Sequence, residues 1–277
     1  SGVISGTGTG SFTKAGTGTL TLEGINTYTG GTTVNAGTLD MTGGGELADS
    51  GKVTVGNNGT YTVGTADLIG VLSNSGMVNV NQDLTASNIT GSGGIAIASS
   101  NTLTADNTAA STYSGVISGD GGLTKTGGEK LTLTGGSDNT YSGATNVDAG
   151  TLVLDKTAGT DAISGAVNLN GGTLELGKDN QIADTSQVTI SSGTFNLADQ
   201  SETVGSIDDG GVAGGSITLG NGSLTAGDNT DTTFSGDISG MGTGSFTKTG
   251  TGNLTLTGAN TYSGGTTVSA GTLTGDT

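Results

Sequence analysis

Residues 1–39 read SGVISGTGTGSFTKAGTGTLTLEGINTYTGGTTVNAGTL, and residues 235–273 read SGDISGMGTGSFTKTGTGNLTLTGANTYSGGTTVSAGTL. The two stretches are near-duplicates of equal length. A looser copy occupies residues 114–152, where a deletion before Leu131 is balanced by an insertion at Ser137 and Asp138. Long copies that recur along one chain indicate a repeat fold, in which each unit packs only against its neighbours.

A shorter unit runs within and between the long copies: a glycine, then Thr, Ser or Asn, an apolar residue, any residue, and usually a second apolar residue. The glycines of this unit lie at positions 18, 37, 59, 150, 172, 193, 215, 252 and 271, and within each run they are 19 to 22 residues apart. This spacing is close to one turn of a parallel β-helix, so the chain predicts a single continuous β-solenoid over residues 1–277 with roughly 14 rungs.

The short units also alternate apolar and polar residues, as in GTLTL at 18–22, GTLEL at 172–176 and GTFNL at 193–197. A period of two is typical of a β-strand with one face buried. The glycine in front of each strand is expected at a corner, and no significant helix is expected anywhere. The side chains expected to point inward are Leu20, Leu22, Leu39, Leu174, Leu176, Phe195 and Leu197.

The composition fits a thin core. Glycine supplies 57 residues, aromatic residues only 3%, and proline is absent, which leaves strand ladders uninterrupted. The chain has seven basic residues, all lysine, against 24 acidic ones, and a net charge of −17. No basic patch is available to neutralise phosphates, so nucleic acid is excluded as a partner.

The sequence contains no run of 18 apolar residues, so no membrane insertion of this segment is predicted. It starts at Ser1 without a leader and stops at Thr277 just after a repeat has begun again. We therefore expect a segment excised from a longer protein, with any signal peptide or membrane anchor outside it.

The long copies resemble the passenger-associated transport repeat of autotransporters: Lys-x-Gly-x-Gly, a Leu-x-Leu strand, Asn-Thr-Tyr-x-Gly-Gly-Thr and Ala-Gly-Thr-Leu. The pattern returns from Lys248 through Leu273, whereas the middle copy departs from it at residues 128–130 and at Ala144. Residues 171–210 also look similar to sequence between such repeats in the diffuse-adherence family of self-associating adhesins. In the first copy the motif is carried by Lys14, Gly16, Gly18, Leu20, Leu22, Asn26, Thr27, Tyr28, Gly30, Gly31, Thr32, Ala36, Gly37, Thr38 and Leu39.

This resemblance implies a right-handed parallel β-helix that is exported through the outer membrane of a Gram-negative bacterium and displayed at the cell surface or secreted. The membrane barrel that it implies is absent from these residues. The implied function is adhesion or cell-to-cell self-association, as in aggregation and biofilm, with the partner a second copy of the chain or a host surface or matrix. The alternative is a passive stalk or a folding-and-transport module that presents a distal domain. The sequence does not identify the interaction face.

Catalytic chemistry has little to build on. Without His, Cys or Arg, the common nucleophile–base pairs cannot form, and no cofactor site is predicted. Some parallel β-helices cleave polysaccharides, so Asp208 and Asp209 beside Gly210 form a candidate carboxylate pair. A solvated turn explains them better, because adjacent strand residues face opposite ways and no Trp is available to hold a sugar ring. We predict that the protein is not an enzyme.

Three other groups have both a ligand-binding and a structural interpretation. Residues Asp228–Asp231 and the pair Asp106–Asn107 offer oxygen ligands for calcium, but they lack a calcium-loop spacing, so turns are preferred and no metal site is predicted. Tyr28, Tyr141 and Tyr262 recur at one motif position, where a structural role is favoured over sugar binding. Thr19 and Thr21 fit the Thr-x-Thr pattern of ice-binding solenoids, but the arrays are interrupted.

Overall fold

A computed structural model describes residues 3–6, 9–212 and 214–275. Over these residues the chain is all-β, with no helix, and forms a parallel β-solenoid of about 13 turns, as predicted. Parts of the first long copy, residues 1–2 and 7–8, lie outside the described residues. The chain divides into two compact units, one of residues 1–132 and 140–143 and the other of residues 133–139 and 144–277.

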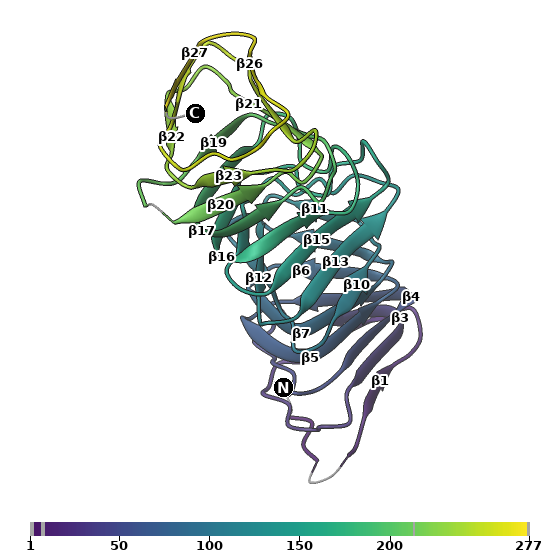
Figure 1. The fold of residues 1–277 in the computed structure, drawn as a ribbon. Helices are drawn as coiled ribbons and strands as arrows, with labels where there is room; N and C mark the ends of the chain where they lie inside the picture. Colours follow the sequence, from purple (N-terminus) through teal and green to yellow (C-terminus); the bar gives the residue numbers. More distant parts are fainter. Residues whose placement is uncertain (1–2, 7–8, 213, 276–277) are drawn as a thin grey trace. The chain divides into compact units, whose positions relative to one another are not determined.

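The first unit consists of three parallel ladders of strands stacked turn upon turn (Figure 1). One ladder runs β1–β3–β4–β5–β7–β10, the second β2–β3–β4–β6–β8–β11 and the third β5–β7–β9–β12. The strands are β1 (Phe12–Lys14), β2 (Thr19–Thr21), β3 (Thr32–Asp40), β4 (Val53–Val63), β5 (Asp67–Asn74), β6 (Met77–Val80), β7 (Leu84–Gly91), β8 (Gly94–Ile97), β9 (Thr102–Asp106), β10 (Ser111–Tyr113), β11 (Ile117–Gly119) and β12 (Gly122–Thr126), with β13 (Lys130–Gly135) crossing the boundary between the units.

The second unit is built in the same way. Its ladders are β14–β16–β17–β19, β15–β16–β17–β20–β23, β18–β21–β24–β26 and β22–β25–β27, all parallel. The strands are β14 (Thr145–Val147), β15 (Thr151–Lys156), β16 (Val167–Leu176), β17 (Gln187–Asn196), β18 (Glu202–Val204), β19 (Ser206–Asp208), β20 (Gly215–Thr218), β21 (Ser223–Ala226), β22 (Thr232–Phe234), β23 (Asp237–Ser239), β24 (Ser245–Lys248), β25 (Asn253–Leu256), β26 (Thr266–Val268) and β27 (Thr272–Gly275).

The length of one turn varies. The residue pairing between neighbouring strands is offset by as little as 17 residues, as between Val78 and Ile95, and by as much as 22, as between Phe195 and Ile217. The straight parts of the strands keep their alternation through these changes, so the differences in length are taken up at the corners and at the bends inside long strands such as β4.

The placement of some corner glycines is corrected by the structure. Gly37, Gly59, Gly172 and Gly193 lie inside β3, β4, β16 and β17 rather than in front of a strand. These strands bend without leaving the ladder, and the pairing shifts register beside the bend, between Val34 and Ala36 and again after Leu169. At Gly37 and Gly193 the bend needs a φ of 67° and 90°, a conformation that favours glycine.

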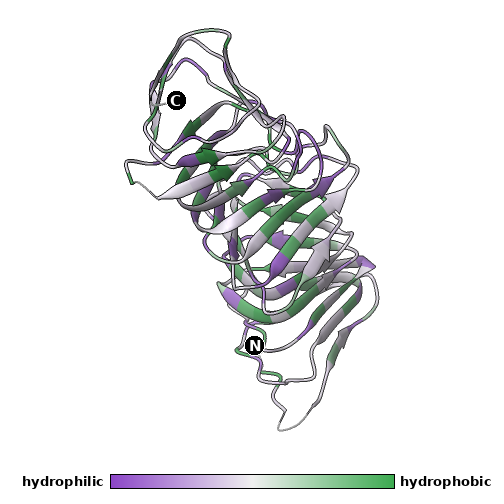
Figure 2. Cartoon of the chain, viewed as in Figure 1, coloured by the Kyte–Doolittle hydropathy of each residue, from purple (hydrophilic) through white to green (hydrophobic). Residues whose placement is uncertain are grey.

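The core is a set of apolar columns inside each unit. Leu152, Leu174, Phe195, Ile217 and Ile238 stack in register through five turns, and each is fully buried. Apolar and polar residues alternate along the strands in Figure 2. Of the seven side chains expected to point inward, six are buried: Leu22, Leu39, Leu174, Leu176, Phe195 and Leu197.

Leu20 is the exception, with 37% of its surface exposed. It pairs with Leu39 on one side, and within the described residues no strand is paired with β2 on the other side. At Leu20 a correct alternation is therefore not enough to bury the side chain, because a paired strand covers it on one side only.

This contrast predicts different costs for two truncations. Phe195→Ala removes a ring stacked between Leu174 and Ile217 and should lower the free energy of unfolding by about 3–5 kcal/mol. Leu20→Ala removes a partly exposed side chain and should cost less than about 1 kcal/mol. Urea unfolding followed by circular dichroism measures both, and equal losses would contradict the assignment of the core.

Candidate functional site

The two adjacent aspartates face different environments. Asp209 is buried, and its carboxylate accepts hydrogen bonds from the backbone N–H and hydroxyl of Ser235 and from the N–H of Gly211. Asp208, which is half-exposed, accepts one from the N–H of Gly210. Burial raises the pKa of Asp209, but the Ser235 hydroxyl and the backbone donors lower it by more, so the net pKa is below its usual value. A general acid needs the opposite shift. Both carboxylates therefore have a structural role: Asp208 stabilises the local turn, and Asp209 links it to Ser235 in the next turn of the solenoid.

The acidic residues considered for calcium make structural hydrogen bonds, within a turn at Asp228 and between neighbouring turns of the solenoid at Asp231 and Asp106. Asp228 accepts hydrogen bonds from the N–H and hydroxyl of Thr230 at 2.8 and 2.6 Å. Asp231 accepts one from the N–H of Asn253, and Asp106 accepts one from the hydroxyl of Thr126. Among the described residues, no three acidic side chains gather as metal ligands would.

The recurring Asn-Thr-Tyr motif ties neighbouring turns together. The Asn26 amide accepts a hydrogen bond from the N–H of Ile4 and donates one to the carbonyl of Glu46, which reaches the turns on both sides. At the same motif position, Asn139 donates to the carbonyl of Ala162, and Asn260 accepts from the N–H of Ile238.

The motif tyrosines belong to the same framework. Tyr28 is 3% exposed and Tyr141 is fully buried, so neither ring offers a platform for a sugar. The Tyr28 hydroxyl lies 2.6 Å from the hydroxyl of Thr32, and Tyr262 makes the same contact with Thr266. The structural role favoured from the sequence fits this geometry.

The outer face of the first unit carries a column of hydroxyl groups. The residues Thr13, Thr33, Thr54, Ser73 and Thr90 pair in register across β1, β3, β4, β5 and β7, and all of them are at least partly exposed. We call this set the hydroxyl column. The charged residues within two positions of any member along the chain are Lys14, which is buried, and Lys52, which is exposed. The column is therefore a nearly neutral strip on a strongly acidic protein.

The second unit carries one neutral and one charged outer strip. The residues Thr203, Thr225, Thr247 and Thr267 pair in register across β18, β21, β24 and β26. Their neighbours along the chain are small or apolar residues and two charged ones, Glu202 and Lys248. Both charged side chains are buried and point inward. We call this set the threonine column. A different ladder exposes Thr151, Thr173, Thr194, Ser216 and Asp237 beside Glu175.

The Thr-x-Thr array at Thr19 and Thr21 is short. Thr19 pairs with Thr38, but Thr21 pairs with Asp40. Two turns further, Met77 and Asn79 occupy the positions that follow Thr60 and Thr62. The regular hydroxyl lattice that an ice-binding surface would need is interrupted, as the sequence predicts.

Four lysines lie inside the solenoid, a feature that the sequence reading missed. Lys14, Lys125, Lys156 and Lys248 are 6%, 0%, 1% and 1% exposed, and their ammonium groups donate to backbone carbonyls. The signal was present in the alternation, because Phe12-Thr13-Lys14 places Lys14 on the same face as Phe12.

A row of buried polar side chains also crosses three turns of the second unit. Gln181 accepts a hydrogen bond from the N–H of Lys156, and Glu202 accepts one from the N–H of Gln181, both at 2.8 Å. Glu202 is 1% exposed and also accepts from the N–H of Thr203. Burial raises the pKa of Glu202 to about 8, although these backbone donors act in the opposite direction.

The first unit has its own internal carboxyl group. Asp67 accepts hydrogen bonds from the N–H of Leu47 and the hydroxyl of Tyr61, both at 3.2 Å. Burial raises its pKa to about 6, although these two donors lower it. As the pH falls, Asp67 therefore becomes protonated at a higher pH than an exposed aspartate does.

Comparison with known proteins found one family model that matches the long copies. The model of the passenger-associated transport repeat family matches residues 12–41, 123–154 and 246–274, about a third of the chain. The match supports an autotransporter passenger domain, and with it export through the outer membrane of a Gram-negative bacterium to the surface or the medium. Searches of curated proteins and of solved structures found no significant match. No helix among the described residues is long and apolar enough to cross a membrane.

The buried Glu202 predicts a stability that falls as the pH rises. Its carboxyl has a pKa of 4.5 when unfolded and about 8 when folded, so between these values the folded state binds more protons. The free energy of unfolding should decline through this window, by several kcal/mol at about 1.4 kcal/mol per pKa unit. Urea unfolding from pH 4 to 9 measures the slope.

Glu202→Gln should remove most of the slope above about pH 6, because the amide cannot ionise and Asp67, whose pKa is about 6, contributes mainly below that pH. Glu175→Gln changes a half-exposed residue of the outer face and is the matched control. Its free energy of unfolding should depend on pH as that of the unmodified protein does. An unchanged slope in Glu202→Gln would show that another group is responsible.

Proposed function

We propose that this chain is part of a surface-displayed adhesin that associates with copies of itself on neighbouring cells. The repeat match supports a passenger that reaches the cell surface. The observation that carries the proposal is the pair of nearly neutral hydroxyl strips, the hydroxyl column and the threonine column, on a chain with a net charge of −17. Both contain the Thr-Thr strands of the matched repeats.

Charge decides which face can take part. Two copies of the same acidic chain repel each other, and like charges placed face to face in an interface cost several kcal/mol. A face lined by Glu175 and Asp237 would carry that cost. Hydroxyl groups can both donate and accept hydrogen bonds, so a hydroxyl strip can pair with a second copy of itself without a complementary partner.

The length of each hydroxyl strip limits how strongly one pair of molecules can associate. Five strands spaced about 4.8 Å apart span roughly 20 Å, which is short for a stable interface. Such interfaces bury about 800 Å² on each partner. A single pair of molecules should therefore associate weakly, whereas many copies on two opposed cells gain through multivalency. Cell clumping is then the sensitive readout.

The experiment displays the protein on a non-clumping bacterial host and follows sedimentation of the culture. Thr33→Glu, Thr54→Glu and Ser73→Glu, introduced together, should place like charges face to face and abolish settling. Thr203→Glu, Thr225→Glu and Thr247→Glu test the threonine column in the same way.

The matched control is the triple change Thr151→Glu, Thr173→Glu and Thr194→Glu on the charged strip, at similar surface levels. It should leave settling unchanged. If all three triple variants settle like the unmodified protein, or if the unmodified protein never clumps, self-association by these faces is wrong and a passive stalk or transport module accounts for the chain.

A further inference from the structure

Each of the three matched segments contains the same kind of corner, which follows a buried lysine. Each begins with an aromatic or leucine residue, a threonine and a lysine: Phe12-Thr13-Lys14, Leu123-Thr124-Lys125 and Phe246-Thr247-Lys248. In each case the lysine lies at or near the end of a strand, β1, β12 or β24, where the chain turns toward the next one. All three side chains are buried.

The ammonium group binds the corner that follows it. Lys14 Nζ lies 3.3 and 2.7 Å from the carbonyl oxygens of Ala15 and Gly16, one and two residues later. It also lies 3.0 Å from the carbonyl oxygen of Ala36, in the next turn. One cation thus holds both its own corner and the turn that covers it.

The other two lysines repeat the contacts with their own corner. Lys125 Nζ donates to the carbonyls of Thr126 and of Gly127, the latter at 2.9 Å. Lys248 Nζ donates to the carbonyls of Thr249 and of Gly250, the latter at 3.1 Å.

The residue two positions after each lysine is a glycine with a positive φ. The values are 77° at Gly16, 69° at Gly127 and 64° at Gly250. This left-handed conformation brings its carbonyl and the preceding one to the same ammonium group, and glycine adopts it without strain. The Lys-x-Gly sequence therefore specifies both the cation and the turn that binds it.

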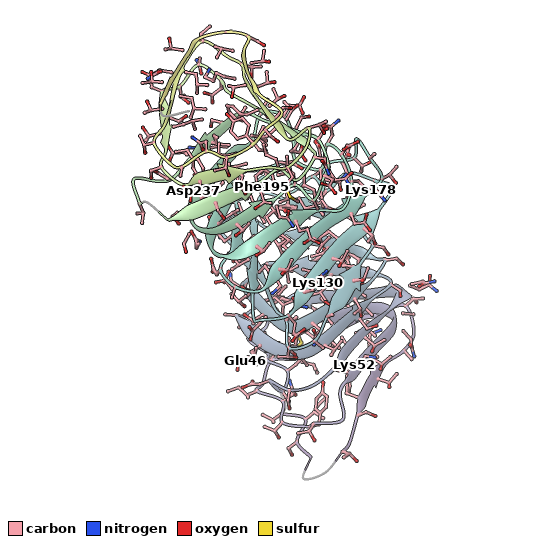
Figure 3. The ribbon with its side chains drawn as sticks, viewed as in Figure 1. Glu46, Lys52, Lys130, Lys178, Phe195 and Asp237 are labelled. Carbon is pink, nitrogen blue, oxygen red and sulfur yellow. The ribbon has the colours of Figure 1, made fainter. Side chains whose placement is uncertain are left out.

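The remaining lysines show that this geometry is specific to the repeat. Lys156 is buried too, but no glycine follows at the second position, and it donates to the carbonyls of Thr134 and Ser137 in the preceding turn. Lys52, Lys130 and Lys178 are exposed and lie at the surface in Figure 3.

We propose that each Lys-x-Gly corner is a cation site built from backbone carbonyls, occupied by the tethered ammonium group of the lysine, and that this charge locks the repeat turn closed. The ammonium groups belong to buried lysines and their hydrogen bonds to these carbonyl oxygens are partly buried, and a charged donor makes stronger hydrogen bonds than a neutral one. The site should therefore accept a free primary alkylammonium ion when the lysine side chain is shortened.

The first test replaces the charge and keeps the aliphatic stem. Lys14→Met, Lys125→Met and Lys248→Met, each made singly in the full chain, should raise hydrogen–deuterium exchange at the corner and at the strands on both sides by roughly 10-fold, since each removes the charged donor that holds two corner carbonyls together. Lys52→Met, Lys130→Met and Lys178→Met are the matched surface controls and should exchange like the unmodified protein.

The second test supplies the missing cation. Lys248→Ala should have a lower melting temperature that propylammonium raises in a saturable way, whereas 1-propanol, of similar size but neutral, should not. Lys178→Ala should respond to neither compound. If Lys248→Ala does not fold, recovery of the β-sheet circular dichroism signal on adding propylammonium replaces the melting temperature.

Three results would overturn the proposal. Exchange in the three internal Met variants equal to that in the surface controls would mean that the charge is not needed. Rescue by propanol as effective as rescue by propylammonium would mean that the side chain only fills space. No rescue by either compound would mean that the corner does not bind an ammonium group.

Discussion

The in-register parallel backbone ladder between successive turns is the constraint on which the rest of this structure depends. Because strands of neighbouring turns pair residue by residue, each side chain must lie against its counterpart one turn away. Inside, this stacks Leu174 on Leu152 and under Phe195. Outside, it lines up hydroxyl groups such as Thr33 and Thr54. One set of hydrogen bonds thus produces both the core and the patterned surface.

Much of this follows from the sequence. The spacing of the short units and their alternation are enough to predict a parallel solenoid, its approximate number of turns and most of its inward side chains. Leu20 shows the limit, because burial depends on a covering turn, which the alternation of one strand does not reveal. Gly172 shows another, because a residue that bends the backbone can stay in the ladder instead of ending the strand.

The internal charged groups were the least predictable part. A reading by hydropathy places every lysine and glutamate outside, yet Lys125 and Glu202 are buried with backbone partners. The strand alternation contained the information for Lys125, which shares a face with Leu123. Nothing comparable marks the two hydroxyl strips that we propose as interaction faces, because threonine and serine are common on every ladder and only the paired register separates neutral strips from charged ones.

The variation in turn length has a consequence for how such a chain can change. Turns of 17 and of 22 residues coexist because the spare residues lie at the corners and at the bends of the long strands. Side chains along a strand alternate between its two faces with a period of two residues. One residue inserted within a straight strand therefore turns every later side chain of that strand to the opposite face. We therefore expect small insertions and deletions to be accommodated at corners and bends but not within the straight part of a strand, whereas duplication of whole turns preserves the alternation. The near-identity of residues 1–39 and 235–273 is the mark that such duplication leaves.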